Sequence, residues 1–184
     1  MNARRELAPS RAPLVVYCAA GIKAPVEAIA AEYTRLHGVP VQLQYGGSQT
    51  LLAALAVAKR GDLFLAGDES YSRAACEKGL AAEVIPVARM TAVLAVRKGN
   101  PKGIRTLDDL RRPNVALSQA MPETAAIGKL VKAALDQGGQ WEAIAQKTKV
   151  FKPTVNDVAG DVALGVADAG FIWDFMRTQY AKLE

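Results

Sequence analysis

Short runs of β-branched and apolar residues alternate along this chain with segments whose apolar residues recur at helical spacing. The run LVVYCAA (14–20) lies between Pro13 and Gly21 and is typical of a strand buried on both faces. After it, Pro25 suits a first helical turn and Gly38 a helix end. This alternation predicts an α/β fold with parallel sheets. We expect strands at 14–20, 39–45, 62–67, 89–99, 114–119, 147–151 and 167–173, and helices at 25–37, 49–60, 71–79, 107–112, 126–137, 141–147 and 155–165.

The pattern divides into two regions. Residues 1–88 are predicted to form a first α/β lobe and residues 89–175 a second. No repeat, low-complexity tract or flexible linker separates them, so we expect the chain to cross between lobes near 86–90. Residues 176–184 are expected to begin a return to the first lobe, which would leave that lobe short of chain. We therefore expect a monomer, or a dimer if another copy completes the lobe.

Composition excludes several classes of protein. No apolar run reaches the 18 or so residues needed to cross a bilayer, which excludes a membrane-spanning protein. The first 13 residues lack the apolar core of a secretory signal, so we expect that none exists or that it has been removed. The net charge of +5 is spread over isolated basic pairs without interleaved aromatic residues. We therefore expect no nucleic-acid partner.

Few residues could support catalysis or metal binding. The sequence has one histidine, His37, and two cysteines, Cys18 and Cys76, which cannot make a zinc cluster. One disulfide would fit, but two unpaired cysteines are favoured because Cys18 lies in an apolar strand pattern. His37 stands at a helix end, where a capping role is favoured over that of a base. No P-loop, dinucleotide fingerprint or GxSxG motif occurs, so we expect no enzyme.

Turns of small and hydroxyl residues recur where a predicted strand passes into a helix. They are AAGIKAP (19–25), GGSQT (46–50), MPETAAIG (121–128) and KPTVNDV (152–158). Each places unpaired backbone N–H groups at a helix N-terminus, at the carboxyl end of a strand, where open α/β sheets bind ligands. Ser48, Ser70 and Thr154 are the expected N-caps. Because helix N-termini favour negative charge, these turns predict an anion site, although each could be an ordinary cap.

Taken in order, these segments resemble the periplasmic molybdate-binding proteins of ABC importers, which are type 2 solute-binding proteins. The resemblance spans residues 14 to about 180. It rests on LVVYCAAG, YGGSQTLLAAL, GDLFLAGD, NPKGIRTLDDL, PETAAIG and VALGVADAGFIW. It implies two Rossmann-like lobes with a ligand cleft between them. It also implies a periplasmic or extracellular protein that binds molybdate or tungstate without a cofactor and delivers it to the membrane subunits of an importer.

The resemblance also implies which residues hold the oxyanion. Ser48 corresponds to a hydroxyl donor, and Ile127 and Val155 to backbone N–H donors. Direct ligation of a metal by side chains is not implied. The ligand-binding residues carried over in this way are Gly21, Ile22, Gly47, Ser48, Ala126, Ile127, Val155 and Trp173.

Three of these positions depart from the family pattern. Gly21 replaces a serine, so only the N–H groups of Gly21 and Ile22 remain there, and Lys23 could compensate. Losing a hydrogen bond to a charged ligand costs about 1.5–3 kcal/mol. Trp173 replaces a tyrosine, and its indole N–H can donate with a different geometry. Ala126 replaces a proline.

Three alternatives remain open at this point. A ferric-iron binder has a similar opening strand and YGG turn but would need tyrosines clustered at the cleft, whereas the tyrosines here are spread along the sequence. The effector-sensing domain of a transcription regulator shares the fold, but no helix-turn-helix precedes Leu14. An enzyme would need His37 and a carboxylate to converge in the cleft.

Overall fold

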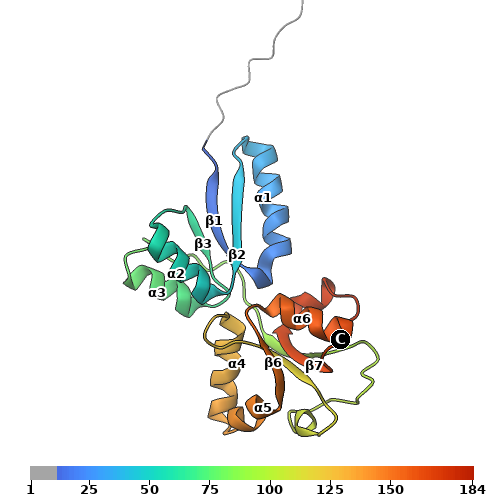
Figure 1. The fold of residues 1–184 in the computed structure, drawn as a ribbon. Coiled ribbons are helices and arrows are strands. Elements are labelled where there is room, and N and C mark those ends of the chain that lie inside the picture. The colour runs from blue at the N-terminus through green and yellow to red at the C-terminus, as the bar shows by residue number, and fades with distance from the viewer. Residues whose placement is uncertain (1–11) are drawn as a thin grey trace, which may run out of the picture.

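The computed structural model describes residues 12–184, and its first half is a three-stranded parallel sheet with order β2-β1-β3. The carboxyl ends of β1 and β2 point toward the second half of the chain (Figure 1). The elements are β1 (Leu14–Ala19), the 3-10 turn η1 (Ala20–Ile22), α1 (Lys23–His37), β2 (Val41–Gly46), α2 (Ser48–Ala58), β3 (Leu63–Leu65) and α3 (Glu69–Glu77).

The second half is a four-stranded mixed sheet with order β4-β7-β5-β6. Only β4 runs antiparallel to its neighbour β7, and β5 is parallel to both β6 and β7. The predicted α/β class is therefore confirmed. The elements are β4 (Ala92–Val96), η2 (Asp108–Arg111), β5 (Leu117–Ala120), α4 (Ala126–Gln137), α5 (Trp141–Lys147), β6 (Thr148–Lys152), α6 (Val155–Leu164), β7 (Ala169–Trp173) and η3 (Asp174–Thr178).

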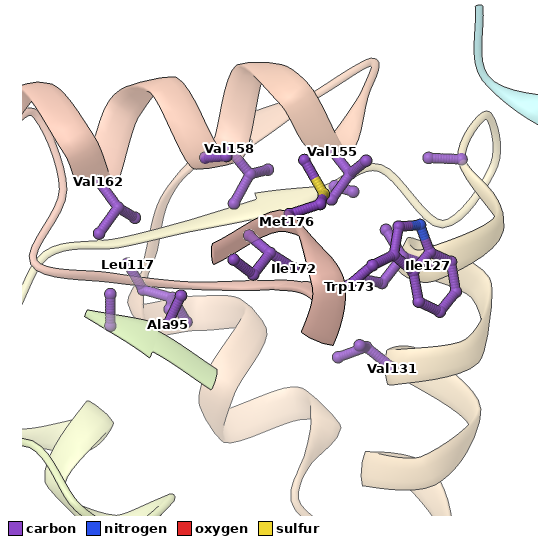
Figure 2. Packing of buried hydrophobic residues seen from close by; sticks show 14 of the residues in the cluster. Ala95, Leu117, Ile127, Val131, Val155, Val158, Val162, Ile172, Trp173 and Met176 are labelled. Atoms are coloured by element: carbon purple, nitrogen blue, oxygen red, sulfur yellow. The ribbon is translucent and has the colours of Figure 1, made fainter. Parts of the chain in front are cut away.

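The larger core lies mainly in the second half, where α6 packs on the sheet, and it extends to Leu52, Tyr71 and Ala75 of the first half. Val158 and Val162 of α6 pack on the cluster that contains Ile172 of β7, and all three are fully buried (Figure 2). Burying a side chain of this kind contributes about 1.5–3 kcal/mol. This packing fixes the N-terminus of α6 against the end of β7.

In the described part of the chain, no helix has the length and apolar character that crossing a membrane requires.

Two predicted helix caps are wrong. Gly47, with extended backbone, is the N-cap of α2, and Ser48 is the first residue of that helix. Asp68 rather than Ser70 caps α3, because its carboxylate accepts the Ser70 N–H at 2.9 Å. Thr154 does cap α6: it accepts the Asp157 N–H, and the Asp157 side chain accepts the Thr154 N–H in return. Serine and aspartate are both common N-caps, so the sequence did not determine whether Asp68 or Ser70 caps α3. Thr154 and Asp157 have the spacing of a capping box, which identifies the cap of α6.

Both cysteines are free thiols, and the expectation that they are unpaired is confirmed. Cys18 lies in β1 with no exposed surface, while Cys76 in α3 is partly exposed. Burial, with a smaller contribution from the charge of Glu27, raises the pKa of the Cys18 thiol to about 12. Because the thiolate is the reactive form, Cys18 is protonated and protected at neutral pH.

We expect iodoacetamide at pH 8 to alkylate Cys76 and to leave Cys18 unmodified in the folded protein. The experiment at pH 8 is about four pH units below the raised pKa of the Cys18 thiol, so the thiol is protonated. Burial also keeps the reagent from reaching it. Peptide mass spectrometry reads the two sites separately. Alkylation in denaturant is the control and should label both cysteines, whereas modification of Cys18 in the folded protein would contradict the buried placement of β1.

Candidate functional site

A small cavity of about 20 Å³ lies where the two halves of the molecule meet. Its walls come from η1, the start of α2, the loop after β3, the starts of α4 and α6, and the end of β7. No lining residue carries a charge. The lining residues are Ala19, Ala20, Gly21, Gly46, Gly47, Ser48, Gly67, Ala125, Ala126, Ile127, Thr154, Val155 and Trp173.

Three helices direct their N-termini at this cavity, and each has ten or more residues. Ser48 and Val155 are the first residues of α2 and α6, and Ala126 and Ile127 open α4. The first N–H groups of a helix have no partner within the helix. Within residues 12–184 these four N–H groups donate to no other protein atom. The cavity therefore has a wall of free donors at the positive ends of three helix dipoles, which suits an anion.

The hydroxyl of Ser48 is oriented by the first half of the molecule. Ser48 is 1% exposed, and its Oγ accepts the backbone N–H of Gly67 at 3.0 Å. A serine hydroxyl that accepts one hydrogen bond still has its own proton to donate. No other described residue accepts that proton, so the arrangement leaves Ser48 free to donate to a group in the cavity.

The Thr154 hydroxyl, unlike that of Ser48, already donates its proton to an acceptor in the protein. Its Oγ1 donates to Asp157 at 2.6 Å within the capping box of α6. This box holds the first turn of α6 and so fixes the direction of the neighbouring Val155 N–H. The Asp157 carboxylate is used in the same box, where it accepts the Thr154 N–H. Thr154 is expected from the sequence only as a cap, and the structure places it at the cavity wall as well.

Seven of the eight residues carried over from the family pattern line this cavity; Ile22 does not. Lys23 does not line it either: its Nζ lies 3.8 Å from a carboxylate oxygen of Glu27 and over the ring of Tyr45. Burial, and then the hydrogen bond to Glu27, raise the pKa of Tyr45 to about 12, so this tyrosine is neutral at physiological pH. Because Lys23 lies beside Glu27 and Tyr45 and not at the cavity, it does not replace the hydroxyl that Gly21 lacks.

The remaining lining residues were not predicted as site residues: Ala19, Ala20, Gly46, Gly67, Ala125 and Thr154. A signal existed for Gly67, because it stands in the GDLFLAGD segment and follows a predicted strand. The others lie beside predicted donors and contribute small side chains that keep the cavity narrow.

The two halves touch directly at the rim of the cavity. The Gln49 N–H donates to the carbonyl oxygen of Thr124 at 3.1 Å, which joins the start of α2 to the loop before α4. Further out, Lys129 of α4 donates to the Ser70 hydroxyl at 2.9 Å, and its Nζ lies 4.9 Å from the centre of the Tyr71 ring. These contacts hold the two walls together.

The residues that line the cavity bear on two of the three alternatives. No tyrosine, histidine or carboxylate lines the cavity. Among residues 12–184, no three His, Cys, Asp or Glu side chains are grouped closely enough to hold a metal ion. His37 ends α1, where its ring packs on Tyr33 with centroids 4.5 Å apart. Neither a cluster of tyrosines for ferric iron nor a convergent histidine and carboxylate is present at this site.

Comparison with known proteins gives consistent matches. The family model described as bacterial extracellular solute-binding protein matches residues 14–181. A putative binding protein of Haemophilus influenzae is 30% identical over 88% of this chain and 68% of its own length. The molybdate-binding protein ModA of Mycobacterium bovis is 28% identical over 87% of this chain, which spans only 60% of that relative's length.

Among solved structures, the sulfate-binding protein SubI of Mycobacterium tuberculosis superposes with a TM-score of 0.76 at 20% identity, covering 95% of this chain and 70% of the other. At this identity the match shows the fold alone. It agrees with the predicted arrangement of α/β units around a cleft.

Proposed function

The chain belongs to the family of bacterial extracellular solute-binding proteins, and on that premise we propose that it captures a tetrahedral oxyanion, molybdate or tungstate, for an ABC importer. As a member of this family it binds a solute and is not an enzyme. One observation carries the proposal. Free N–H groups from α2, α4 and α6 and the hydroxyl of Ser48 converge on one cavity that has no charged side chain.

The donor set favours a fully deprotonated anion. Hydrogen bonds from backbone N–H groups and a hydroxyl to a charged ligand contribute about 1.5–3 kcal/mol each, so several of them can hold a dianion without a countercharge. Phosphate carries a proton near neutral pH and needs an acceptor for it. Because no carboxylate or other acidic side chain lines the cavity, phosphate is the poorer ligand.

The size of the cavity favours a compact ion. A volume of about 20 Å³ has room for about one water molecule, so the lining must adjust even for a five-atom oxyanion, and an extended organic solute would require a far larger change. Molybdate, tungstate and sulfate share shape and charge, and sulfate is the smaller ion. Donors fixed at helix ends can select among them by radius. We choose molybdate and tungstate for two reasons. The glycine-serine turn and the last strand resemble those of molybdate-binding proteins, and the mycobacterial relative is named as a molybdate-binding protein.

Delivery to an importer requires that the protein act outside the cytoplasmic membrane, and we place it in the periplasm or at the cell exterior. Its partners would be the membrane subunits of an ABC transporter. The contacts between the halves at Gln49 and Thr124 would then form when the anion is trapped and break when it is released.

The proposal is tested by isothermal titration with molybdate, tungstate, sulfate and phosphate at pH 7.5. We expect saturable binding of one molybdate or tungstate per chain, weaker binding of sulfate and none of phosphate. If none of the four anions binds saturably, the proposal is refuted.

Replacement of the buried hydroxyl gives a sharper result. We expect Ser48→Ala to weaken molybdate binding by about 10-fold to 100-fold, since one hydrogen bond to a charged ligand is lost. Ser72→Ala is the matched control, because Ser72 lies in α3 outside the cavity lining. Equal affinity of the Ser48 and Ser72 variants, measured by the same titration, would remove Ser48 from the site.

A further inference from the structure

Gly21 and Trp173 lie far apart in the sequence and share one space at the cavity wall. A β-carbon added at Gly21 would lie 2.9 Å from both Cδ1 and Nε1 of Trp173, and 2.9 Å from Cγ1 of Val155. β-carbons do not approach other heavy atoms so closely in proteins, where carbon atoms sit about 3.5–4.0 Å apart. The indole of Trp173 therefore occupies the space into which a side chain at position 21 would extend.

The indole N–H belongs to a buried side chain and has no acceptor among the described residues. Trp173 is 3% exposed and lines the cavity. Within residues 12–184, no oxygen accepts a hydrogen bond from its Nε1. Figure 2 shows the ring next to Ile127, and Val131 lies below it. The nitrogen is not fully enclosed by protein atoms, so the N–H can reach a group in the cavity, where a hydrogen bond to a charged ligand contributes about 1.5–3 kcal/mol.

The surroundings hold the ring in one orientation. Trp173, Ile127 and Val155 belong to the same buried cluster, and the backbone of Trp173 pairs with Ala92 at the end of β7. A serine hydroxyl can rotate and can accept as well as donate, whereas an indole N–H only donates. The wall at Gly21 therefore presents one fixed donor with no accepting capacity.

We propose that the Trp173 indole N–H is an anion donor at the η1 wall, and that Gly21 is the residue that admits it. This inference rests on the proposed function. The two residues act as a single unit that determines specificity, because any side chain at position 21 displaces the donor. Since the indole cannot accept a proton, the unit favours an oxyanion that has no proton on the oxygen it meets. Molybdate, tungstate and sulfate are of that class.

A double-mutant cycle tests the coupling. We expect Trp173→Leu to weaken molybdate binding by about 10-fold to 100-fold through loss of the donor. Gly21→Ser should weaken binding as well, because its side chain displaces the indole. In the double variant the flexible leucine leaves room for the serine hydroxyl, so we expect it to bind at least about tenfold more tightly than Trp173→Leu alone. Additive losses in the cycle would overturn the proposal.

A second measurement avoids the risk that the leucine variant folds poorly. In the Trp141→Phe background Trp173 is the sole tryptophan, and its indole N–H gives one resonance in a ¹⁵N correlation spectrum. We expect this resonance to move downfield at saturating molybdate. Trp141 packs on Phe151 outside the cavity, so Trp141→Phe should bind molybdate with unchanged affinity.

The outcomes separate the two proposals. If the unmodified protein binds molybdate or tungstate while the indole resonance does not move and Trp173→Leu binds equally well, the role of Trp173 is refuted and the oxyanion function stands. If the unmodified protein binds none of the four anions, the premise itself fails.

Discussion

Replacing Gly47 by alanine is expected to abolish tight binding of the anion while leaving the fold intact. A β-carbon at this position would lie 2.3 Å from the carbonyl oxygen of Thr124, 2.9 Å from its carbonyl carbon and 3.2 Å from the carbonyl oxygen of Pro153. These are backbone atoms of the loops that lead into α4 and α6, so a side-chain rotation cannot relieve the overlap. The walls would have to part by about 1 Å to restore ordinary contact.

That separation removes the donors of the second half from the anion. Hydrogen bonds weaken steeply beyond normal length, and losing two of them to a charged ligand costs about 3–6 kcal/mol, more than a hundredfold in affinity. The backbone of Gly47 has φ −67° and ψ 148°, which alanine adopts readily. The free energy of unfolding should therefore fall by about 1 kcal/mol or less, the effect of the changed N-cap.

Titration calorimetry with molybdate and a thermal melt together check this expectation. Gly160→Ala is the matched control, since a β-carbon at Gly160 in α6 meets nothing within 4 Å. The control should bind as the unmodified protein does. A Gly47→Ala protein whose affinity lies within threefold of the unmodified protein would show that contact between the two walls is not needed to hold the anion.

Replacing Gly170 by alanine is expected to cause the largest loss of stability. Gly170 lies in β7 beneath α6, and a β-carbon there would lie 2.5 Å from Cγ1 of Val158, 2.9 Å from the carbonyl oxygen of Ser118 and 3.2 Å from Cγ2 of Val162. The two valines have stiff side chains, and the serine contact is with backbone. The helix must therefore move away from the sheet.

Overpacking of this kind costs about 1–3 kcal/mol. For a chain of this length each kcal/mol lowers Tm by roughly 2–4 °C, so we expect a fall of up to about 12 °C by calorimetry or circular dichroism. Anion affinity should also fall, because α6 carries the Val155 N–H at its start. Gly160→Ala again serves as the control, on the same helix but in open space. An unchanged Tm for Gly170→Ala would contradict the close packing of α6 on β7.

Several parts of the site could be predicted from local sequence because they depend on neighbouring residues. The turn GGSQT and the capping box of Thr154 and Asp157 are short-range features, and the structure has helices starting where these patterns indicate. The resemblance to molybdate binders then placed Gly21, Gly47, Ser48, Ala126, Ile127, Val155 and Trp173 at one site, and the structure brings them to one cavity.

Other parts depend on contacts between distant segments. Ser48 was expected to cap α2, but its hydroxyl accepts the N–H of Gly67, which follows a strand on the other side of β1. Ile22 was expected at the cavity, and the 3-10 turn carries it outside the lining. Lys23 was expected to compensate for Gly21, but Glu27 and Tyr45 hold it away from the cavity. In each case a partner brought near by folding determines where the group points.

By itself the sequence determined the order of strands and helices and the positions of the turns that offer free N–H groups. Periodicity and capping act over a few residues, so they can be recognised along the chain. Only the tertiary structure decided that Trp173 fills the space beside Gly21, and that Gly47 touches the backbone of Thr124. Such contacts depend on how two sheets pack across a cavity, and close packing fixes them through distances that no local pattern encodes.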